Sequence, residues 1–383
     1  MQSAALLWHA YELTESGTAL AMMAAAEWLP ILLVSLWAGD LADRFSRSRL
    51  LQISQLAQLF PAMALGWMTF AGSASIEVLL VTAFVGAIGQ AVDAPARKTL
   101  AVELVSKAEL SRVLSTMDLI KNGAKLAGPV MMGLLTAALG VEAVYGVNGF
   151  SFLAMIVACH RLGAPPVPSE TESGTGLLGR IRIAAREIRK SEVLRGLLIL
   201  DFGITFTAGA EVLLPMIAKS TLGLGAEGYG ILASGTALGA ILAGLVLAWR
   251  PPSRRVGGVL RWSAFGFALA TIGFGLATEP VGAFICLGLL GAADTFNTVL
   301  RNTWIQLSIS NSLRGRITAL SSLVTKSGPR LGQIEAGLVA AALGPAASII
   351  LGGILAGVWT QFVFRTHPGL AGIGIQDGDD KPR

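Results

Sequence analysis

Residues 38–49 read AGDLADRFSRSR and separate two apolar runs, residues 18–37 and residues 50–71. The short stretch holds two aspartates and three arginines, whereas the two runs together hold one charged residue, Glu27. Each run is long enough to cross the hydrocarbon core of a membrane, which takes about 20 mostly apolar residues. The pattern therefore indicates a charged hairpin loop between two membrane-spanning helices.

The overall composition is typical of a membrane protein rather than a soluble one. Of the 383 residues, 53% are hydrophobic and only 14% are charged, whereas soluble domains carry about 25% charged residues. The 46 glycines fit tightly packed membrane helices, in which small residues let backbones approach. Basic residues in cytoplasmic loops account for the net charge of +5, so we expect no nucleic-acid partner.

Motifs for catalysis are absent from the sequence. It contains no Ser/His/Asp arrangement, no cluster with metal-ligand spacing and no phosphate-binding GxxxxGK[ST] loop. The two cysteines, Cys159 and Cys286, each lie in an apolar run and are expected to be buried thiols. We therefore expect a protein that is not an enzyme and that needs no metal and no cofactor.

Eleven segments are apolar enough, and to within a few residues long enough, to span a membrane. They lie near residues 18–37, 50–71, 76–93, 115–139, 141–160, 195–218, 228–249, 259–277, 280–300, 319–343 and 345–364. Residues 1–11, MQSAALLWHAY, are apolar but too short to cross. We expect there either a truncated first helix or a chain start that has been assigned too late.

Lysine and arginine are divided unevenly between the two sides that these spans define. If residues 38–49 are cytoplasmic, that side holds 24 of the 29 basic residues, and the other side holds Lys219 alone. Four more lie inside apolar segments: Lys121, Lys125, Lys326 and Arg330. So strong a bias sets orientation. We expect a multi-pass protein of a bacterial-style inner membrane, with both termini in the cytoplasm.

The two halves of the chain repeat each other. A shift of 204 residues aligns Arg97 with Arg301 and residues 137–140 with residues 341–344, without a gap over more than forty positions. Two parallel halves are a transporter architecture, with the substrate path between them. The expected organisation is a six-helix half over residues 1–162, a cytoplasmic linker with a basic amphipathic helix over residues 163–194, a second six-helix half over residues 195–365 and a cytoplasmic tail over residues 366–383.

The quoted stretch resembles a known signature. Gly39–Arg49 is similar to the loop 2–3 motif of the major facilitator superfamily, GxLADRxxRRR, with Ser48 where a basic residue is usual. Further stretches resemble the drug- and siderophore-exporting branch that includes the enterobactin exporter: DAPAR (93–97), ELVSKAEL (103–110), NGAKLAGP (122–129), NTWIQ (302–306) and LRGR (313–316). The resemblance implies an all-α membrane protein, a major facilitator-type 6+6 transmembrane helix bundle with a truncated first helix.

The same resemblance implies a gating role for the quoted stretch. In the family, the aspartate at the position of Asp43 helps to lock the two halves together in the outward-facing state. We therefore expect Asp43 to pair with Arg97 or with the start of the helix near residue 319. Arg47 and Arg49 are explained equally well as residues that only set topology. The gating residues expected here are Gly39, Asp43, Arg44, Arg47, Arg49 and Arg97.

Charges inside the apolar segments are expected to be paired, hydrated or used, because each charge at mid-bilayer costs roughly 2.5–3.5 kcal/mol. One alternative is that these charges form structural ion pairs. The other is that they have separate transport roles, in which carboxylates carry protons and cations bind an anionic group of the substrate. Glu27 and Asp201 are the first candidates for proton carriers, since neither has an opposite charge within four residues. The expected pathway residues are Glu27, Asp118, Lys121, Asn122, Lys125, Asp201, Glu211, Asp294, Lys326 and Arg330.

These features together predict a secondary active transporter that exports small amphiphilic organic molecules by alternating access. Export and proton antiport follow from the family resemblance. The expected partners are a small-molecule substrate, protons and membrane lipids, and a monomer is expected. Two alternatives stay open at this point. One is a lysophospholipid or metabolite carrier, and the other is a non-transporting membrane sensor on a transporter fold.

Overall fold

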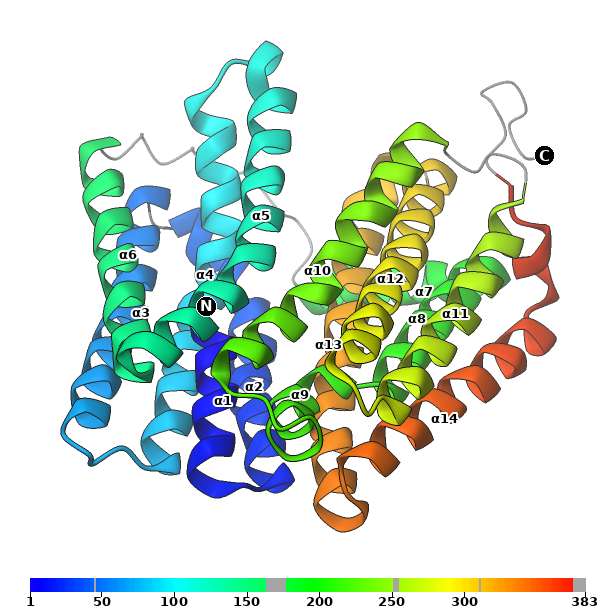
Figure 1. Cartoon of the computed structure of the whole chain (residues 1–383). Helices are drawn as coiled ribbons and strands as arrows, with labels where there is room; N and C mark the ends of the chain where they lie inside the picture. Colours follow the sequence, from blue (N-terminus) through cyan, green and yellow to red (C-terminus); the bar gives the residue numbers. More distant parts are fainter. Residues whose placement is uncertain (45, 163–176, 251–254, 310, 375–383) are drawn as a thin grey trace. The chain divides into compact units, whose positions relative to one another are not determined.

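The computed structural model describes residues 1–44, 46–162, 177–250, 255–309 and 311–374. Side chains are described for most of these residues, but not for residues 35–44 or for scattered positions in later helices. Within these ranges the chain forms helices and no strand (Figure 1). Eight of the described helical segments are long and apolar enough to cross a membrane.

The predicted spans coincide with the observed helices. Ten of the eleven correspond to one helix each, the eleventh to the helix Glu192–Thr207 and the short helical turns after it, and residues 2–11 fall in the short helix α1. The helices of the first part are α1 (Gln2–Thr14), α2 (Gly17–Arg44), α3 (Arg47–Phe70), α4 (Ile76–Leu104), α5 (Lys107–Leu139) and α6 (Val141–Leu162).

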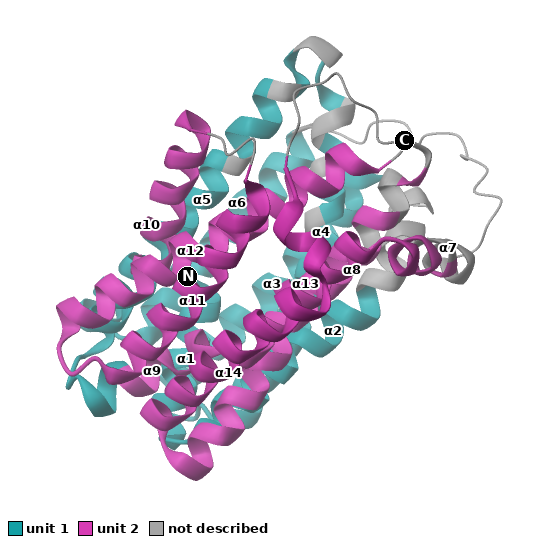
Figure 2. Ribbon diagram, turned by 90° about the vertical axis from the view of Figure 1, so that its right-hand side faces the viewer, with its two compact units in different colours: residues 1–173, 218–234 teal, residues 174–217, 235–383 magenta. Residues whose placement is uncertain are grey.

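The chain divides into two compact units, shown in two colours in Figure 2. Unit 1 comprises residues 1–173 and 218–234, and unit 2 comprises residues 174–217 and 235–383. Helix α10 (Ala226–Trp249) therefore contributes its first part to unit 1 and the rest to unit 2. The other helices of unit 2 are α7 (Leu177–Lys190), α8 (Glu192–Thr207), α11 (Val256–Leu276), α12 (Pro280–Ser308), α13 (Asn311–Leu343) and α14 (Pro345–Thr366).

The internal repeat is visible in the packing of each unit. In unit 1, α3 packs against α4 and α6, and in unit 2 the equivalent helix α11 packs against α12 and α14. The tight links also match: Gly140 between α5 and α6 and Gly344 between α13 and α14 have φ angles of 84° and 86°. A side chain is strained in that left-handed region, so glycine is required at both equivalent positions.

Large apolar side chains are exposed along the described helices. The most exposed aromatic ones are Trp67, Phe70 and Phe150 in unit 1 and Trp249 and Trp262 in unit 2, with exposed fractions of 69–85%. Water would disfavour so much bare aromatic surface, whereas lipid chains cover it at no cost. These surfaces therefore fit a chain that lies in a membrane.

The expected hairpin loop at residues 38–49 is almost entirely helical. Helix α2 continues through Arg44 and α3 begins at Arg47, so only two residues separate them. We expected each helix to end where the polar residues begin, and that was wrong. A helix satisfies its own backbone hydrogen bonds and can continue beyond the hydrocarbon core, whatever its side chains.

Part of the predicted cytoplasmic tail packs against unit 2. After α14 the chain forms a short turn, η3 (Pro368–Gly372), that packs against α8 and α11 (red, Figure 1). Leu370 and Ile373 are buried, and the Gly257 backbone N–H donates to the Ile373 carbonyl at 3.1 Å. The Gly369 N–H donates to the Glu192 carboxylate at 3.2 Å. These contacts hold the chain beyond α14 beside the start of α8.

Candidate functional site

An ion pair between two helices is the most deeply buried charge contact in the described part of unit 2. Asp201 of α8 forms an ion pair with Arg301 of α12, and each side chain is only 6% exposed. The predicted proton carrier Asp201 therefore has a counter-ion, which comes from a residue 100 positions away. The apolar span was expected to end near residue 300, with Arg301 in the loop after it, but Arg301 is helical because α12 continues to Ser308.

Polar neighbours complete this buried site. Asn297, one turn before Arg301 on α12, is 3% exposed and donates its amide to the Ala293 carbonyl at 3.1 Å. Thr205, one turn after Asp201 on α8, donates its hydroxyl to the Asp201 carbonyl at 2.7 Å. These bonds satisfy the Asn297 amide N–H and the Thr205 hydroxyl, whereas the Asn297 Oδ1 and the Arg301 Nε are buried without a hydrogen-bond partner among the described residues.

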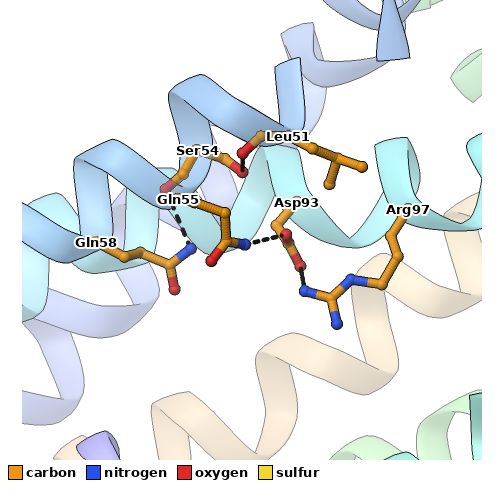
Figure 3. Close-up of polar contacts among 6 residues, drawn as sticks. All are labelled: Leu51, Ser54, Gln55, Gln58, Asp93 and Arg97. Carbon is orange, nitrogen blue, oxygen red and sulfur yellow. Dashed lines mark hydrogen bonds and ion pairs between the residues drawn. The ribbon is translucent and has the colours of Figure 1, made fainter. Parts of the chain in front are cut away.

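The equivalent arginine in unit 1 is bonded differently. Arg97 donates to Asp93 of its own helix α4 at 2.5 Å, and Gln55 of α3 donates to the other carboxylate oxygen at 2.7 Å (Figure 3). The Arg97 side chain is 46% exposed and that of Asp93 is 14% exposed. Gln58 and Ser54 bond to backbone carbonyls of α3 beside them (Figure 3). The carboxylate of Asp93 thus joins α3 to α4, while Arg97 stays near the surface.

The start of α3 contains the best-described part of the expected gating stretch. Arg47 is only 6% exposed. A residue that only sets topology does not need to be buried. Ser48 is 1% exposed and donates its hydroxyl to the Cys159 carbonyl of α6 at 2.9 Å. The serine that departs from the family signature therefore ties α3 to α6, whereas Arg49 is exposed.

The rest of that stretch belongs to α2. Gly39, Asp43 and Arg44 are helical, but their side chains lie outside the described residues. The pair between Asp43 and Arg97 stays a prediction. What the structure adds is that Arg97 already bonds to Asp93.

The predicted cations lie on two long helices that are equivalent in the repeat. On α5, Lys121, Asn122 and Lys125 are exposed, and the side chain of Asp118 is outside the described residues. On α13, Lys326 is exposed and Arg330 is half-buried, donating to Gln333 at 3.1 Å. The structure thus keeps each set on one long helix of its own unit.

The helix that carries Asp201 is interrupted. A continuous span was expected over residues 195–218, but α8 ends at Thr207 and the chain proceeds through a 3₁₀ turn (Ala210–Leu213), a single α-turn (Leu214–Met216) and a π-turn (Ile217–Thr221). At the break, a Cβ on Gly209 would lie 2.2 Å from the Gly332 backbone of α13, so only glycine fits. Interrupted helices of this kind often border transport sites.

The remaining predicted carboxylates occupy different environments. Glu27 in α2 is 9% exposed, whereas Glu211, directly after the break, is exposed. Asp294 in α12 is half-buried. No group of three His, Cys, Asp or Glu side chains that could hold a metal ion occurs among the described residues.

One buried polar contact in unit 1 was not foreseen. His9 of α1 is 4% exposed, and its Nδ1 lies 3.1 Å from the hydroxyl of Tyr145 on α6. Trp8 stacks on Tyr229 of α10 with ring centroids 5.4 Å apart. The sequence around His9 does not predict this contact, because Tyr145 is 136 positions away.

Comparison with known proteins identifies the family. Residues 1–368 match the family described as "Transmembrane secretion effector", which is of the major facilitator type. The "Staphyloferrin A transporter" of Staphylococcus aureus is 24% identical over 299 residues, which cover 76% of this chain and 73% of that protein. The "Multidrug efflux pump Tap" of Mycolicibacterium fortuitum is 28% identical over 370 residues, which cover 92% and 89%.

Solved structures show the same fold at low sequence identity. The inward-open xylose transporter XylE from E. coli matches with a TM-score of 0.71 and 12% identity over 95% of this chain and 92% of that chain. A bacterial homologue of ferroportin matches with a TM-score of 0.60 and 18% identity over 94% and 95%. The chain therefore belongs to the major facilitator family of membrane transporters, in its transmembrane secretion effector group, and folds as the helix bundle of that family.

Proposed function

We propose that this protein is a secondary active transporter that exports small amphiphilic molecules, of drug or siderophore type, from the cell. Two relatives support this substrate class, a siderophore transporter and a multidrug efflux pump that match most of this chain. We propose proton antiport through alternating access as the mechanism, with both termini in the cytoplasm. The uneven distribution of basic residues supports that orientation.

The buried pair between Asp201 and Arg301 carries the proposal of proton coupling. Both residues lie in segments that are long and apolar enough to cross a membrane, and both side chains are 6% exposed. A carboxylate in that environment has two ways to avoid an isolated charge: it binds a cation or it binds a proton. A proton that reaches Asp201 would therefore compete with Arg301 and loosen the contact between α8 and α12.

The other polar residues are assigned supporting roles in this proposal. Glu27 is a second candidate carrier because it is buried in the apolar helix α2. The cations of α5 and α13 would attract an anionic or catecholate-like group on the substrate. Further pathway residues are Asp118, Lys121, Asn122, Lys125, Glu211, Asp294, Lys326 and Arg330, and the gating residues are those named above at the ends of α2, α3 and α4.

The test measures coupling directly. Inside-out vesicles that contain the protein are energised to an acid interior, and dyes, antibiotics and catecholate siderophores are added in turn while the pH gradient is followed. At least one compound should dissipate part of the gradient, and Asp201→Asn should abolish this response. Glu279→Gln is the matched control, because it removes an exposed carboxylate at the start of α12.

Two outcomes would contradict the proposal in different ways. If no compound dissipates the gradient, proton antiport fails, and a lysophospholipid or metabolite carrier becomes the better candidate. If a compound does so equally well with Asp201→Asn, transport is coupled to protons through another carboxylate, and Glu27→Gln is tested next.

A further inference from the structure

Helix α7 carries a row of cations that the proposed function does not use. The positions 182, 186 and 189 follow the spacing i, i+4 and i+7 and so share one face of the helix. All three are arginines, and all three are exposed. Within the described residues none of them has an ion-pair partner, whereas Lys190 next to them bonds to Glu187 at 2.7 Å. This face of α7 is therefore strongly positive and largely unneutralised.

A neighbouring face of α7 packs against the rest of unit 2. Ile188 packs against the apolar core of unit 2, and Ala185, one turn earlier, is half-buried. The helix contacts α13 and α8. Figure 2 shows α7 at one end of unit 2, beside α8. The arginine face is thus presented by a helix that is held in place.

Helix α7 connects almost directly to the helix of the buried ion pair. Ser191 alone separates α7 from α8, and its hydroxyl caps α8 by accepting from the Leu194 N–H at 3.2 Å. The amphipathic helix expected within the linker is α7, which ends at Lys190. Because Asp201 lies on α8, any force that holds α7 also restrains the helix that carries the proposed proton site.

Other parts of unit 2 have the composition of a membrane interface. The start of α8 bonds to the chain beyond α14, since Arg195 donates to His367 at 3.3 Å. The end of α10 and the start of α11 expose Trp249 and Trp262, which are 85% and 75% exposed, and an arginine precedes or follows each of them in the sequence. Exposed tryptophan with arginine is typical of the level of the lipid headgroups.

We propose that the arginine face of α7 binds the headgroups of anionic phospholipids and thereby anchors the adjoining end of α8 to the membrane surface. Guanidinium groups bind phosphate oxygens through charge-assisted, often bidentate hydrogen bonds. Basic residues close to an anionic membrane surface attract it within a Debye length. A membrane is the one partner that is continuously present beside a helix packed on a membrane bundle.

Lipid binding can be measured without relying on transport. The purified full-length protein in detergent is titrated with phosphatidylglycerol or phosphatidylcholine, and bound lipid is counted by native mass spectrometry. The wild type should prefer phosphatidylglycerol. Neutralising the face should lower that preference roughly 10-fold or more, since each basic residue contributes about fivefold near an anionic surface. The variant combines Arg182→Gln, Arg186→Gln and Arg189→Gln.

A matched variant separates charge from packing. Replacing Arg182, Arg186 and Arg189 with lysine keeps the positive face and should keep most of the preference. Raising the ionic strength from about 0.1 M to about 1 M shortens the Debye length from about 10 Å to about 3 Å, so the wild-type preference should fall. An unchanged preference in the glutamine variant would overturn the proposal. If that variant does not fold, a wild-type preference that salt leaves unchanged would overturn it instead.

The anchoring step rests on the proposed function and has its own readout. In proteoliposomes, substrate-driven proton movement by the wild type should slow when phosphatidylglycerol is replaced by phosphatidylcholine, and the glutamine variant should not respond to this exchange. Equal sensitivity of both proteins would refute anchoring while leaving lipid binding intact. Absence of any proton movement in either lipid would refute the proposed function and not the lipid site.

Discussion

Arg97 in unit 1 and Arg301 in unit 2 occupy equivalent positions of the repeat but have different partners. Arg97 bonds to Asp93 one turn away on its own helix, and 46% of its side chain is exposed. Arg301 bonds to Asp201 on another helix, and its side chain is 6% exposed. The position equivalent to Asp93 is Asn297, which carries no charge. Unit 2 therefore has its carboxylate on the neighbouring helix.

The difference shows which of the two pairs can transmit a change of charge. Neutralising Asp93 alters contacts with Gln55 and with an arginine that water can still reach. Neutralising Asp201 leaves Arg301 buried among apolar side chains, and the two helices that they join must respond. Both carboxylates join two helices, but only in the second arrangement would a protonated carboxylate leave a buried cation between them without a counter-ion.

The largest effect is expected for Arg301→Gln. This change leaves the Asp201 carboxylate buried without its counter-ion, and breaking a buried pair in this way typically costs about 3–5 kcal/mol. The unfolding midpoint in detergent should fall markedly, and substrate-driven proton movement should be lost. Differential scanning fluorimetry of the purified variant checks the first effect, and an unchanged midpoint would show that the pair does not support the fold.

A second experiment converts unit 2 to the pattern of unit 1. Asp201→Asn alone should destabilise the protein, because it leaves the Arg301 guanidinium buried without a carboxylate. Adding Asn297→Asp supplies a carboxylate four residues before Arg301, which is the spacing of Asp93 and Arg97. The double variant should recover most of the unfolding midpoint but no proton coupling, since the new pair lies within one helix.

Recovery of proton coupling in the double variant would show that α8 need not carry the carboxylate. Failure to recover the midpoint would show that the carboxylate cannot reach Arg301 from α12. Asn297→Asp in the wild-type background is the control, because it adds the new carboxylate while Asp201 is present.

Hydrophobic patterns predicted the helices of both units but not where the charges in them lie. Spans of about 20 apolar residues are dictated by the thickness of a bilayer, so the order of helices followed from composition. Arg301 was placed in a loop because the apolar run ends near residue 300. The helix continues nevertheless, since its backbone hydrogen bonds do not depend on apolar side chains. Residues 38–49 were predicted to form a loop for the same reason, because the apolar runs stop on either side of them.

The partners of the buried charges could not be predicted, because they come from distant positions. Asp201 and Arg301 are 100 residues apart, and His9 and Tyr145 are 136 apart. The repeat gave no partner for Arg301, but it did distinguish this arginine by aligning it with Arg97. The break after Thr207 had no such signal: its glycine is one of 46, and only the contact with Gly332 distinguishes it.

An intermediate effect is expected for Gln55→Leu in unit 1. Gln55 is 3% exposed, and its amide donates to the Asp93 carboxylate at 2.7 Å. Loss of a hydrogen bond to a charged group costs about 1.5–3 kcal/mol, so the unfolding midpoint should fall, but by less than with Arg301→Gln. Gln55→Glu should be worse, because it places a second carboxylate beside Asp93. If both variants unfold at the wild-type midpoint, this hydrogen bond contributes nothing to stability.

The smallest effect on stability is expected for Arg97→Gln. An ion pair four residues apart on one helix, with a side chain that is 46% exposed, contributes only about 0.3–0.5 kcal/mol. The unfolding midpoint should therefore hardly change, in contrast to the equivalent change at Arg301. A large drop would show that Arg97 has a second partner, and the predicted Asp43 would be the first residue to test. In that case Asp43→Asn should lower the midpoint by the same amount, and combining it with Arg97→Gln should add nothing further.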